Sequence, residues 1–185
     1  DEAQELTDAQ WQMLILRCPS RSFTIVGDRA QARHGFTESW RERLDRIGLP
    51  DMREAQLRLN YRTPAEVMAV AEPAIRSALP DANVPTSVRS NGQEVVYGTT
   101  AELEGLLAQW LSSDDEGTAC VISNSSYESS NDRVLALTPE LAKGLEFDVV
   151  VLVNPDAFGD GIEGAVDRYV AMTRATTKLV ILSND

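Results

Sequence analysis

Four short apolar runs in the second half of the chain limit its fold more than any other feature. They read TACVIS (118–123), VLALT (134–138), DVVVLVNP (148–155) and KLVILS (178–183). Each has the length of one strand and is apolar without a break, as expected where both faces of a sheet are covered. A helical pattern near 100–112 precedes the first run, and another, in AVDRYVAMTRAT, lies between the last two. The alternation predicts an α/β fold with a mostly parallel sheet and helices on both faces.

The beginning of the chain carries fewer elements. Thr7 or Asp8 can cap a helix whose apolar residues recur at helical spacing until Pro19 ends it. The run RSFTIVGD predicts a buried strand that leads into a loop, and TESWRERLDRIG predicts a second helix. These elements are too few to form a core alone.

The pattern changes near residue 51. A short strand is predicted at 56–60 and a helix at 64–79, before a looser stretch leads to the helix near 100. We therefore expect residues 1–50 to be the end of one domain and residues 51–185 to form a second domain.

Charge and composition exclude several classes of function. The 29 acidic and 17 basic residues give a net charge of −12, which argues against holding nucleic acid by bulk electrostatics. Residues 21–62 nevertheless contain nine arginines and six acids, so an anion site is best sought there, with ordinary charge scatter as the alternative. Cys18, Cys120 and the single His34 lie far apart in the sequence, which disfavours a zinc site or a Ser-His-Asp triad. No run reaches the roughly 20 apolar residues of a membrane span, and we expect a cytoplasmic protein.

Two acids open the chain. Asp1 and Glu2 can simply favour the dipole of a following helix. The functional alternative is an aspartate that holds magnesium beside a glutamate that orients water for phosphoryl transfer, which requires a buried strand before the pair. The pair alone does not decide between these interpretations.

Four later motifs carry polar residues next to predicted strands or helices. Gln31 in GDRAQ follows a strand end and can sense a terminal phosphate, although a simple turn is the alternative. In LNYRTP, Arg62 is suited to bidentate phosphate binding and Tyr61 to stacking on a base, although such an arginine is more often a surface residue. In KGLEFD, Glu146 can accept hydrogen bonds from a ribose. In TRA, Arg174 near a helix end has the position of an arginine finger.

The five motifs DEAQ, GDRAQ, NYR, KGLEFD and YVAMTRA, in this order, resemble the second to sixth motifs of superfamily 1 helicases of the UvrD/Rep type. The resemblance is greatest to the HelD branch, motors associated with bacterial RNA polymerase. It implies a RecA-like second domain preceded by the end of a first one, with ATP and Mg²⁺ as cofactors and single-stranded or duplex DNA as partner. RNA polymerase is a further expected partner.

The resemblance also implies roles for individual residues. Asp1 would hold Mg²⁺, and Glu2 would be the general base. Gln4 and Gln31 would link the γ-phosphate to domain movement, and Phe36 would stack on nucleic-acid bases, with packing at the domain boundary as the alternative. The remaining residues would surround the nucleotide: Arg62 and Arg174 at the γ-phosphate, Tyr61 at the adenine, and Gly144 with Glu146 at the ribose.

Three features depart from the helicase pattern. The GxxxxGK[ST] loop is absent from the sequence, so we expect a part of a larger motor that is inactive alone. About 80 residues separate Arg62 from Lys143, too few for the duplex-engaging insertion of Rep-type helicases. Glu140 stands where related sequences have histidine. The alternatives are a DNA repair or recombination helicase, a protein-interaction module with an acidic surface, and a RecA-like domain without catalysis.

Overall fold

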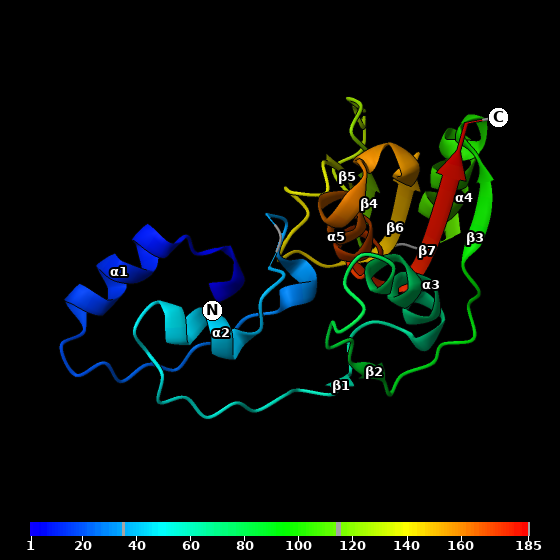
Figure 1. The fold of residues 1–185 in the computed structure, drawn as a ribbon. Helices are drawn as coiled ribbons and strands as arrows, with labels where there is room; N and C mark the ends of the chain where they lie inside the picture. The colour runs from blue at the N-terminus through cyan, green and yellow to red at the C-terminus, as the bar shows by residue number, and fades with distance from the viewer. Residues whose placement is uncertain (35, 114–115, 185) are drawn as a thin grey trace.

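A five-stranded parallel sheet forms the centre of the protein, in a computed structural model that describes residues 1–34, 36–113 and 116–184 (Figure 1). The strand order is β3-β7-β6-β4-β5, and every pair in it is parallel. The α/β prediction is therefore confirmed. The strands are β3 (Val96–Thr99), β4 (Ala119–Ile122), β5 (Val134–Leu137), β6 (Phe147–Val153) and β7 (Ala175–Ser183).

Helices cover both faces of this sheet. Helices α3 (Ala65–Arg76) and α5 (Gly161–Met172) pack on one face, where they share a core with Val150 and Leu152 of β6. Helix α4 (Leu103–Ser113) covers the other face, which takes up the alternate residues Val149 and Val151. Because successive side chains of a strand point to opposite faces, burial of both faces explains why the run at β6 is apolar throughout.

The looser stretch before residue 100 contains two strands that the sequence pattern did not indicate. Strand β3 forms an edge of the main sheet and contains Gly98. Strand β2 (Thr86–Ser87) pairs with β1 (Leu59–Asn60) in a separate two-stranded parallel sheet. Two short 3₁₀ turns lie further along the chain, η3 (Thr100–Glu102) and η4 (Pro155–Phe158). We call residues 59–184 the sheet lobe.

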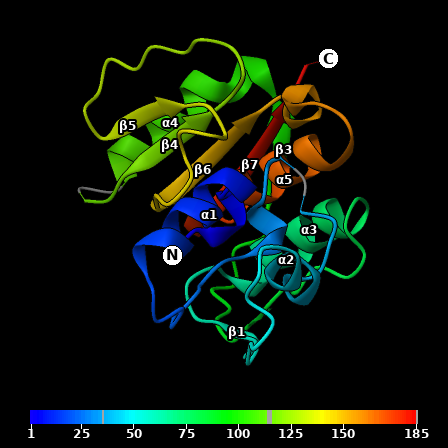
Figure 2. The ribbon, with the colours of Figure 1, turned by 60° about the vertical axis from the view of Figure 1, so that its left-hand side comes forward.

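Residues 1–50, which we call the N-terminal lobe, form a second, smaller packing unit (Figures 1 and 2). Helices α1 (Asp8–Arg17) and α2 (Trp40–Arg46) begin at capping boxes on Thr7 and Ser39. Trp11, Ile15, Leu44 and Ile47 pack together in a cluster separate from both faces of the sheet. Two 3₁₀ turns complete the lobe, η1 (Ala3–Glu5) and η2 (Arg29–Gln31).

The strand predicted over RSFTIVGD is not formed, and this part of the prediction was wrong. Residues 21–28 are assigned to no strand, although Phe23 and Ile25 pack against the cluster around Trp11. The backbone contact of this segment with η1 is a bond in which the amide of Ala3 donates to the carbonyl of Val26 over 3.1 Å. A strand needs a neighbouring strand for its hydrogen bonds, and no strand of the described residues lies beside this segment.

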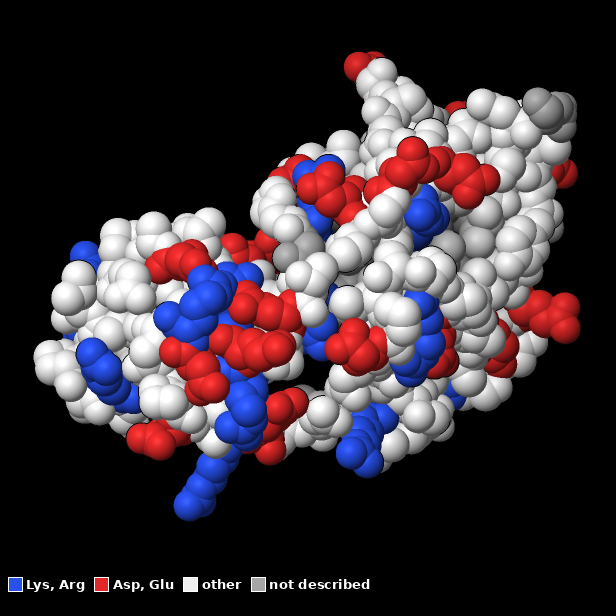
Figure 3. All heavy atoms as spheres, viewed as in Figure 1, with Lys and Arg blue, Asp and Glu red and all other residues white. Residues whose placement is uncertain are grey.

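The two lobes meet through polar side chains and through the buried Ala30 of η2, which belongs to the core that α3 and α5 share with the sheet. Turn η2 lies against α5, and Arg29 pairs with Asp81 of the sheet lobe over 2.9 Å. Basic and acidic side chains are intermixed on the face shown in Figure 3. Many arginines of the segment 21–62 are therefore engaged with carboxylates rather than presented as one positive surface. Among the described residues, no helix combines the length and apolarity that crossing a bilayer requires.

Candidate functional site

Most of the predicted site residues gather where the N-terminal lobe faces the amino ends of β6 and β7. Glu146 directly precedes β6, and Arg174 directly precedes β7. The amide of Phe147 donates to the carbonyl of Arg174 over 3.0 Å, so the first ladder bond between these strands holds the two site residues side by side. Gly144 supplies the turn before Glu146 with a positive φ of 77°, which favours glycine.

Arg62 is held at this place by its own backbone and by Glu146. The side-chain oxygen of Asn60 accepts bonds from the amides of Arg62 (2.9 Å) and Thr63 (3.1 Å), which fixes the turn after β1. The Nη1 atom of Arg62 then donates to Oε1 of Glu146 over 2.8 Å. The Nε atom of Arg62 is buried and has no hydrogen-bond partner in the described residues. The guanidinium therefore keeps a donor available for an acceptor that enters the site.

Arg174 is the most unusual member of the site because its charge is buried. The residue is 2% exposed, and its guanidinium donates to the carbonyl of Val170 (3.0 Å) and to that of Leu145 (3.4 Å). Burial, together with the nearby charge of Arg62, lowers the pKa of Arg174 to about 10 against the opposing effect of Glu146. The side chain remains charged at neutral pH. A buried cation next to a second cation is an environment that favours a bound anion.

The N-terminal lobe contributes a chain of side-chain hydrogen bonds. Gln4 donates to the carboxylate of Glu2 over 2.5 Å and accepts the amide of Asp28 over 3.1 Å. The Oδ2 atom of Asp28 accepts Nε2 of Gln31 over 2.9 Å. Desolvation raises the pKa of Asp28, the hydrogen bond from Gln31 opposes this rise, and the charges of Glu2 and Arg174 act with smaller, opposite effects. Gln31 thus contacts Asp28 directly, and the charges of Glu2 and Arg174 act on it.

Lys143 connects the two lobes at the same place. Its ammonium group donates to the carbonyl of Gln31 over 2.8 Å and pairs with the carboxylate of Glu5. Asp28 and Lys143 are the site residues that sequence reasoning missed. The available signals were the strand-end Gly-Asp pair and the lysine before Gly144, but neither pattern shows which residues these side chains contact.

Three predicted residues lie outside this cluster. Tyr61 is 70% exposed. Phe36 is 2% exposed, with its ring 4.6 Å from that of Trp40 and beneath the guanidinium of Arg43, so its surface is covered by the N-terminal lobe. Asp1 is exposed, and its carboxylate accepts the amide of Glu2 over 2.9 Å. Their roles toward adenine, nucleic acid and metal stay predictions.

The donor set fits a polyphosphate better than it fits a metal ion alone. Arg62 and Arg174 offer guanidinium donors from two adjacent loops, one of them desolvated. The described residues contain no group of three or more His, Cys, Asp or Glu side chains arranged to hold a metal. Mg²⁺ commonly takes one or two protein carboxylates together with phosphate oxygens. The exposed carboxylate of Asp1 could supply such a ligand only with a nucleotide present.

Comparison with known proteins agrees with the helicase motifs in the second half of the chain. Residues 133–182, which are 50 of the 185 residues, match the family described as UvrD-like helicase C-terminal domain. Gly144, Glu146 and Arg174 lie within this range. A search of curated proteins found no match.

Two similar solved structures are both helicases by description. One is the C-terminal domain of a possible DNA helicase from Lactobacillus plantarum WCFS1, with a TM-score of 0.48 and 18% identity over 68% of this chain and 88% of that chain. The other is nsp10, a helicase of PRRSV, with a TM-score of 0.40 and 18% identity over 71% of this chain. The matched part spans 24% of the nsp10 chain.

Proposed function

We propose that this chain forms part of an ATP-driven nucleic-acid motor of the UvrD type, with the end of a first RecA-like domain and a complete second one. The observation that carries the proposal is the meeting of two sets of residues from different lobes. The carboxyl-terminal set contains the buried cation Arg174, and the amino-terminal set contains Glu2 and Gln31. ATP bound at such a boundary would draw the lobes together, and hydrolysis would release them.

The proposed roles follow the motifs. Arg62 and Arg174 bring positive charge to the γ-phosphate, and Gln4 with Gln31 transmits its presence to the N-terminal lobe. The hydrogen-bond chain from Glu2 through Gln4 to Gln31 is consistent with such transmission. The other proposed contacts are Glu2 as general base, Asp1 at Mg²⁺, Tyr61 at adenine, and Gly144 with Glu146 at the ribose.

The environment of Arg174 is consistent with the role of an arginine finger. A cation that is already desolvated and fixed by backbone carbonyls needs little reorganisation when negative charge develops on the transferred phosphoryl group. Removal of an arginine finger lowers the rate by about 10³- to 10⁵-fold in systems that use one. Removal of Arg174 should therefore affect turnover far more than nucleotide binding.

The test uses the full-length protein, including the GxxxxGK[ST] loop that the proposed function requires. We expect Arg174→Ala to reduce nucleic-acid-stimulated ATP hydrolysis by about 10³-fold or more, while ATP affinity changes only a few-fold. Arg168→Ala is the matched control because this arginine of α5 donates to the carbonyl of Gly159 over 2.9 Å and lies outside the site. Unchanged turnover in Arg174→Ala would overturn the assignment.

The net charge of −12 favours a second candidate function, docking of an acidic surface on a basic protein partner. The resemblance to the HelD branch makes RNA polymerase the partner to test, and a repair or recombination helicase is the competing parent. Binding of the full-length protein to RNA polymerase and to forked DNA should be compared at two salt concentrations. Salt-sensitive polymerase binding supports docking, whereas strong unwinding without polymerase binding supports a repair helicase.

A further inference from the structure

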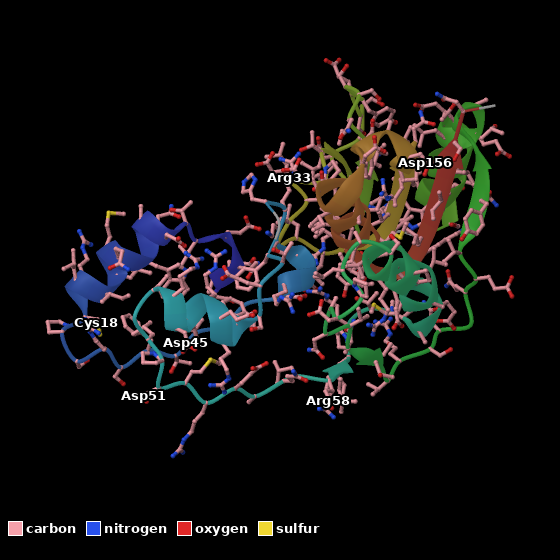
Figure 4. All side chains as sticks on the ribbon, in the orientation of Figure 1. Cys18, Arg33, Asp45, Asp51, Arg58 and Asp156 are labelled. Atoms are coloured by element: carbon pink, nitrogen blue, oxygen red, sulfur yellow. The ribbon has the colours of Figure 1, made fainter. Side chains whose placement is uncertain are left out.

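Arg33 joins the two lobes two residues after Gln31. Figure 4 shows it at the junction between the N-terminal lobe and the sheet lobe. Its Nε atom lies 3.2 Å from each carboxylate oxygen of Asp167 on α5, and its Nη1 atom donates to Glu140 over 3.1 Å. One guanidinium from the N-terminal lobe thus holds two carboxylates of the sheet lobe.

The two carboxylates differ in burial. The side chain of Glu140 is 68% exposed, so its pairing with Arg33 is screened by solvent. The side chain of Asp167 is only 6% exposed, and its oxygens are taken out of water beneath Arg33. Burial raises the pKa of Asp167, and the charge of Arg33 opposes that rise. Loss of Arg33 would leave a buried carboxylate without its cation, which is far more costly than loss of a surface ion pair.

The place of Asp167 on α5 connects this pair to the candidate site. Asp167 lies on α5, seven residues before Arg174 in the sequence. Helix α5 ends at Met172 and continues through Thr173 directly into Arg174 and β7. A shift of the N-terminal lobe that is transmitted to Asp167 therefore reaches the helix whose end leads directly into Arg174.

A second contact between the lobes involves the same turn, but here the cation belongs to the sheet lobe. Lys143 of the sheet lobe donates to the carbonyl of Gln31, whereas Arg33 of the N-terminal lobe reaches Glu140. Glu140 and Lys143 lie three residues apart in one loop. Each lobe thus contributes one cation that contacts the other lobe. Lys143 contacts Gln31 itself, the residue proposed to sense the γ-phosphate, and Arg33 lies two residues after it.

We propose that Arg33 is a positioning residue that fixes the Gln31 turn on helix α5 and thereby sets the separation of Gln31 from Arg174. The role of these two residues at the γ-phosphate rests on the proposed function. The connection between the lobes does not rest on it, because it is argued from the ion pairs of Arg33 with Glu140 and Asp167 alone. The two statements can therefore be tested separately.

The first measurement is the distance between the lobes in the full-length protein. Spin labels would replace Leu16 and Tyr97, which are 80% and 64% exposed and lie in different lobes. All variants carry Cys18→Ser, and any other reactive cysteine is also replaced, so that the label attaches only at the chosen positions. Cys120 is fully buried and can stay. We expect one narrow distance distribution in the parent and a broader one in Arg33→Ala.

The matched control for this experiment is Arg46→Ala. Arg46 also pairs with two carboxylates, Glu38 and Asp8, and its side chain is 45% exposed against 37% for Arg33, but all its partners belong to the N-terminal lobe. The control should leave the distribution narrow. Arg33→Lys, which retains one point charge, should restore it in part. An unchanged distance distribution in Arg33→Ala, or an equal broadening in Arg46→Ala, would overturn the proposal that Arg33 holds the two lobes together.

The second measurement is the split between kcat and KM for ATP. If Arg33 positions Gln31 and Arg174, then Arg33→Ala should lower kcat by about tenfold or more, because small misplacements of reacting groups are costly. KM should change by less than about twofold. Asp167→Asn should act like Arg33→Ala, and the double variant should be no worse than either.

The outcomes separate the two proposals. A parent without ATP hydrolysis overturns the proposed function, and the distance measurement then decides on the connection between the lobes alone. A broadened distribution with unchanged kcat overturns positioning of the site by Arg33. A broadened distribution with lowered kcat and unchanged KM supports the inference in full.

Discussion

Arg174 lies close enough to Arg62 for the positive charge of Arg62 to lower the pKa of Arg174. Glu146 lies between the two arginines in the sequence. Glu146 accepts a hydrogen bond from the more exposed Arg62, while Arg174 donates to the carbonyls of Val170 and Leu145 and to the hydroxyl of Thr173. The positive charge of the buried Arg174 is therefore less well compensated by an acidic partner than that of Arg62. Such an arrangement costs stability and is typical of a functional site.

Arg174→Met should consequently stabilise the fold. Methionine has a similar length and no charge to desolvate, and replacement of buried ionic groups by apolar ones is often stabilising. We expect the free energy of unfolding at pH 7 to rise by about 1 kcal/mol, as measured by urea denaturation. Arg168→Met, which removes a partly exposed arginine of the preceding helix α5, should give no such gain. A clear loss of stability in Arg174→Met would show that its carbonyl contacts outweigh the burial of charge.

Asp28→Asn should also be stabilising, but in a manner that depends on pH. Burial raises the pKa of Asp28 above its ordinary 3.8. The native state then binds its proton more tightly than the unfolded chain, so wild-type stability from this group is present at low pH and is lost as pH rises through the native pKa. Asparagine avoids this loss and retains an oxygen for the amide of Ala30, which Asp28 accepts over 2.9 Å.

The expected gain of Asp28→Asn at pH 7 is about 1 kcal/mol, and it should shrink toward pH 4. Urea denaturation of both proteins at the two pH values measures it. Asp8→Asn provides the contrast, because its ion pairs lower the pKa of Asp8 and this substitution should lose stability at pH 7. A gain for Asp28→Asn that grows on acidification would contradict the assignment of burial as the cause.

The sheet was largely predictable from sequence because burial on both faces produces an unambiguous pattern. The apolar run at β6 is an example, because Val150 and Leu152 enter one core and the alternate residues Val149 and Val151 enter the other. Strand β3 escaped prediction because it is short, lies at an edge and contains Gly98. The run RSFTIVGD shows the opposite case, since it has a strand-like pattern but no neighbouring strand among the described residues.

The site was predictable to the extent that its members lie next to strands. Glu146 and Arg174 each precede a strand of a parallel pair, so the pairing itself brings them together. The contacts of Arg33 and Lys143 could not be predicted in the same way. They span 134 and 112 residues, respectively, and depend on how the two lobes pack, which no local pattern encodes.

Gly27→Ala should destabilise the N-terminal lobe. A Cβ atom at this position would lie 2.7 Å from the ring of Trp40 and 2.8 Å from Oε1 of Gln4, both closer than van der Waals contact permits. We expect a loss of about 1–3 kcal/mol and a weaker bond from Asp28 to Gln4. Gly105→Ala is the control, because this exposed position in α4 has open space for a Cβ. That substitution should instead stabilise the protein by about 0.5–1 kcal/mol, and equal losses in both variants would contradict the packing argument.

Ser90→Ala should shift the acid sensitivity of the sheet lobe through Glu66. The hydroxyl of Ser90 donates to Oε1 of Glu66 over 2.5 Å, and the amide of Gly92 donates to the same oxygen over 2.9 Å. These bonds favour the ionised carboxylate, and the hydroxyl is the largest cause that lowers the pKa of Glu66 from 4.5 to about 2. Because the native pKa is the lower one, Glu66 stabilises the fold above about pH 4.5, and this contribution disappears as pH falls toward 2.

Without the hydroxyl, the native pKa of Glu66 should move back toward 4.5, since one donor to the carboxylate is removed while the amide of Gly92 remains. The side-chain carboxyl resonance of Glu66, followed by NMR titration, reports this shift directly. Ser112→Ala is the control, because its hydroxyl donates to the carbonyl of Gln109 within α4 rather than to a carboxylate. A titration midpoint of Glu66 that is the same in Ser90→Ala and in the parent would show that helix α3, whose first turn contains Glu66, lowers the pKa without the serine.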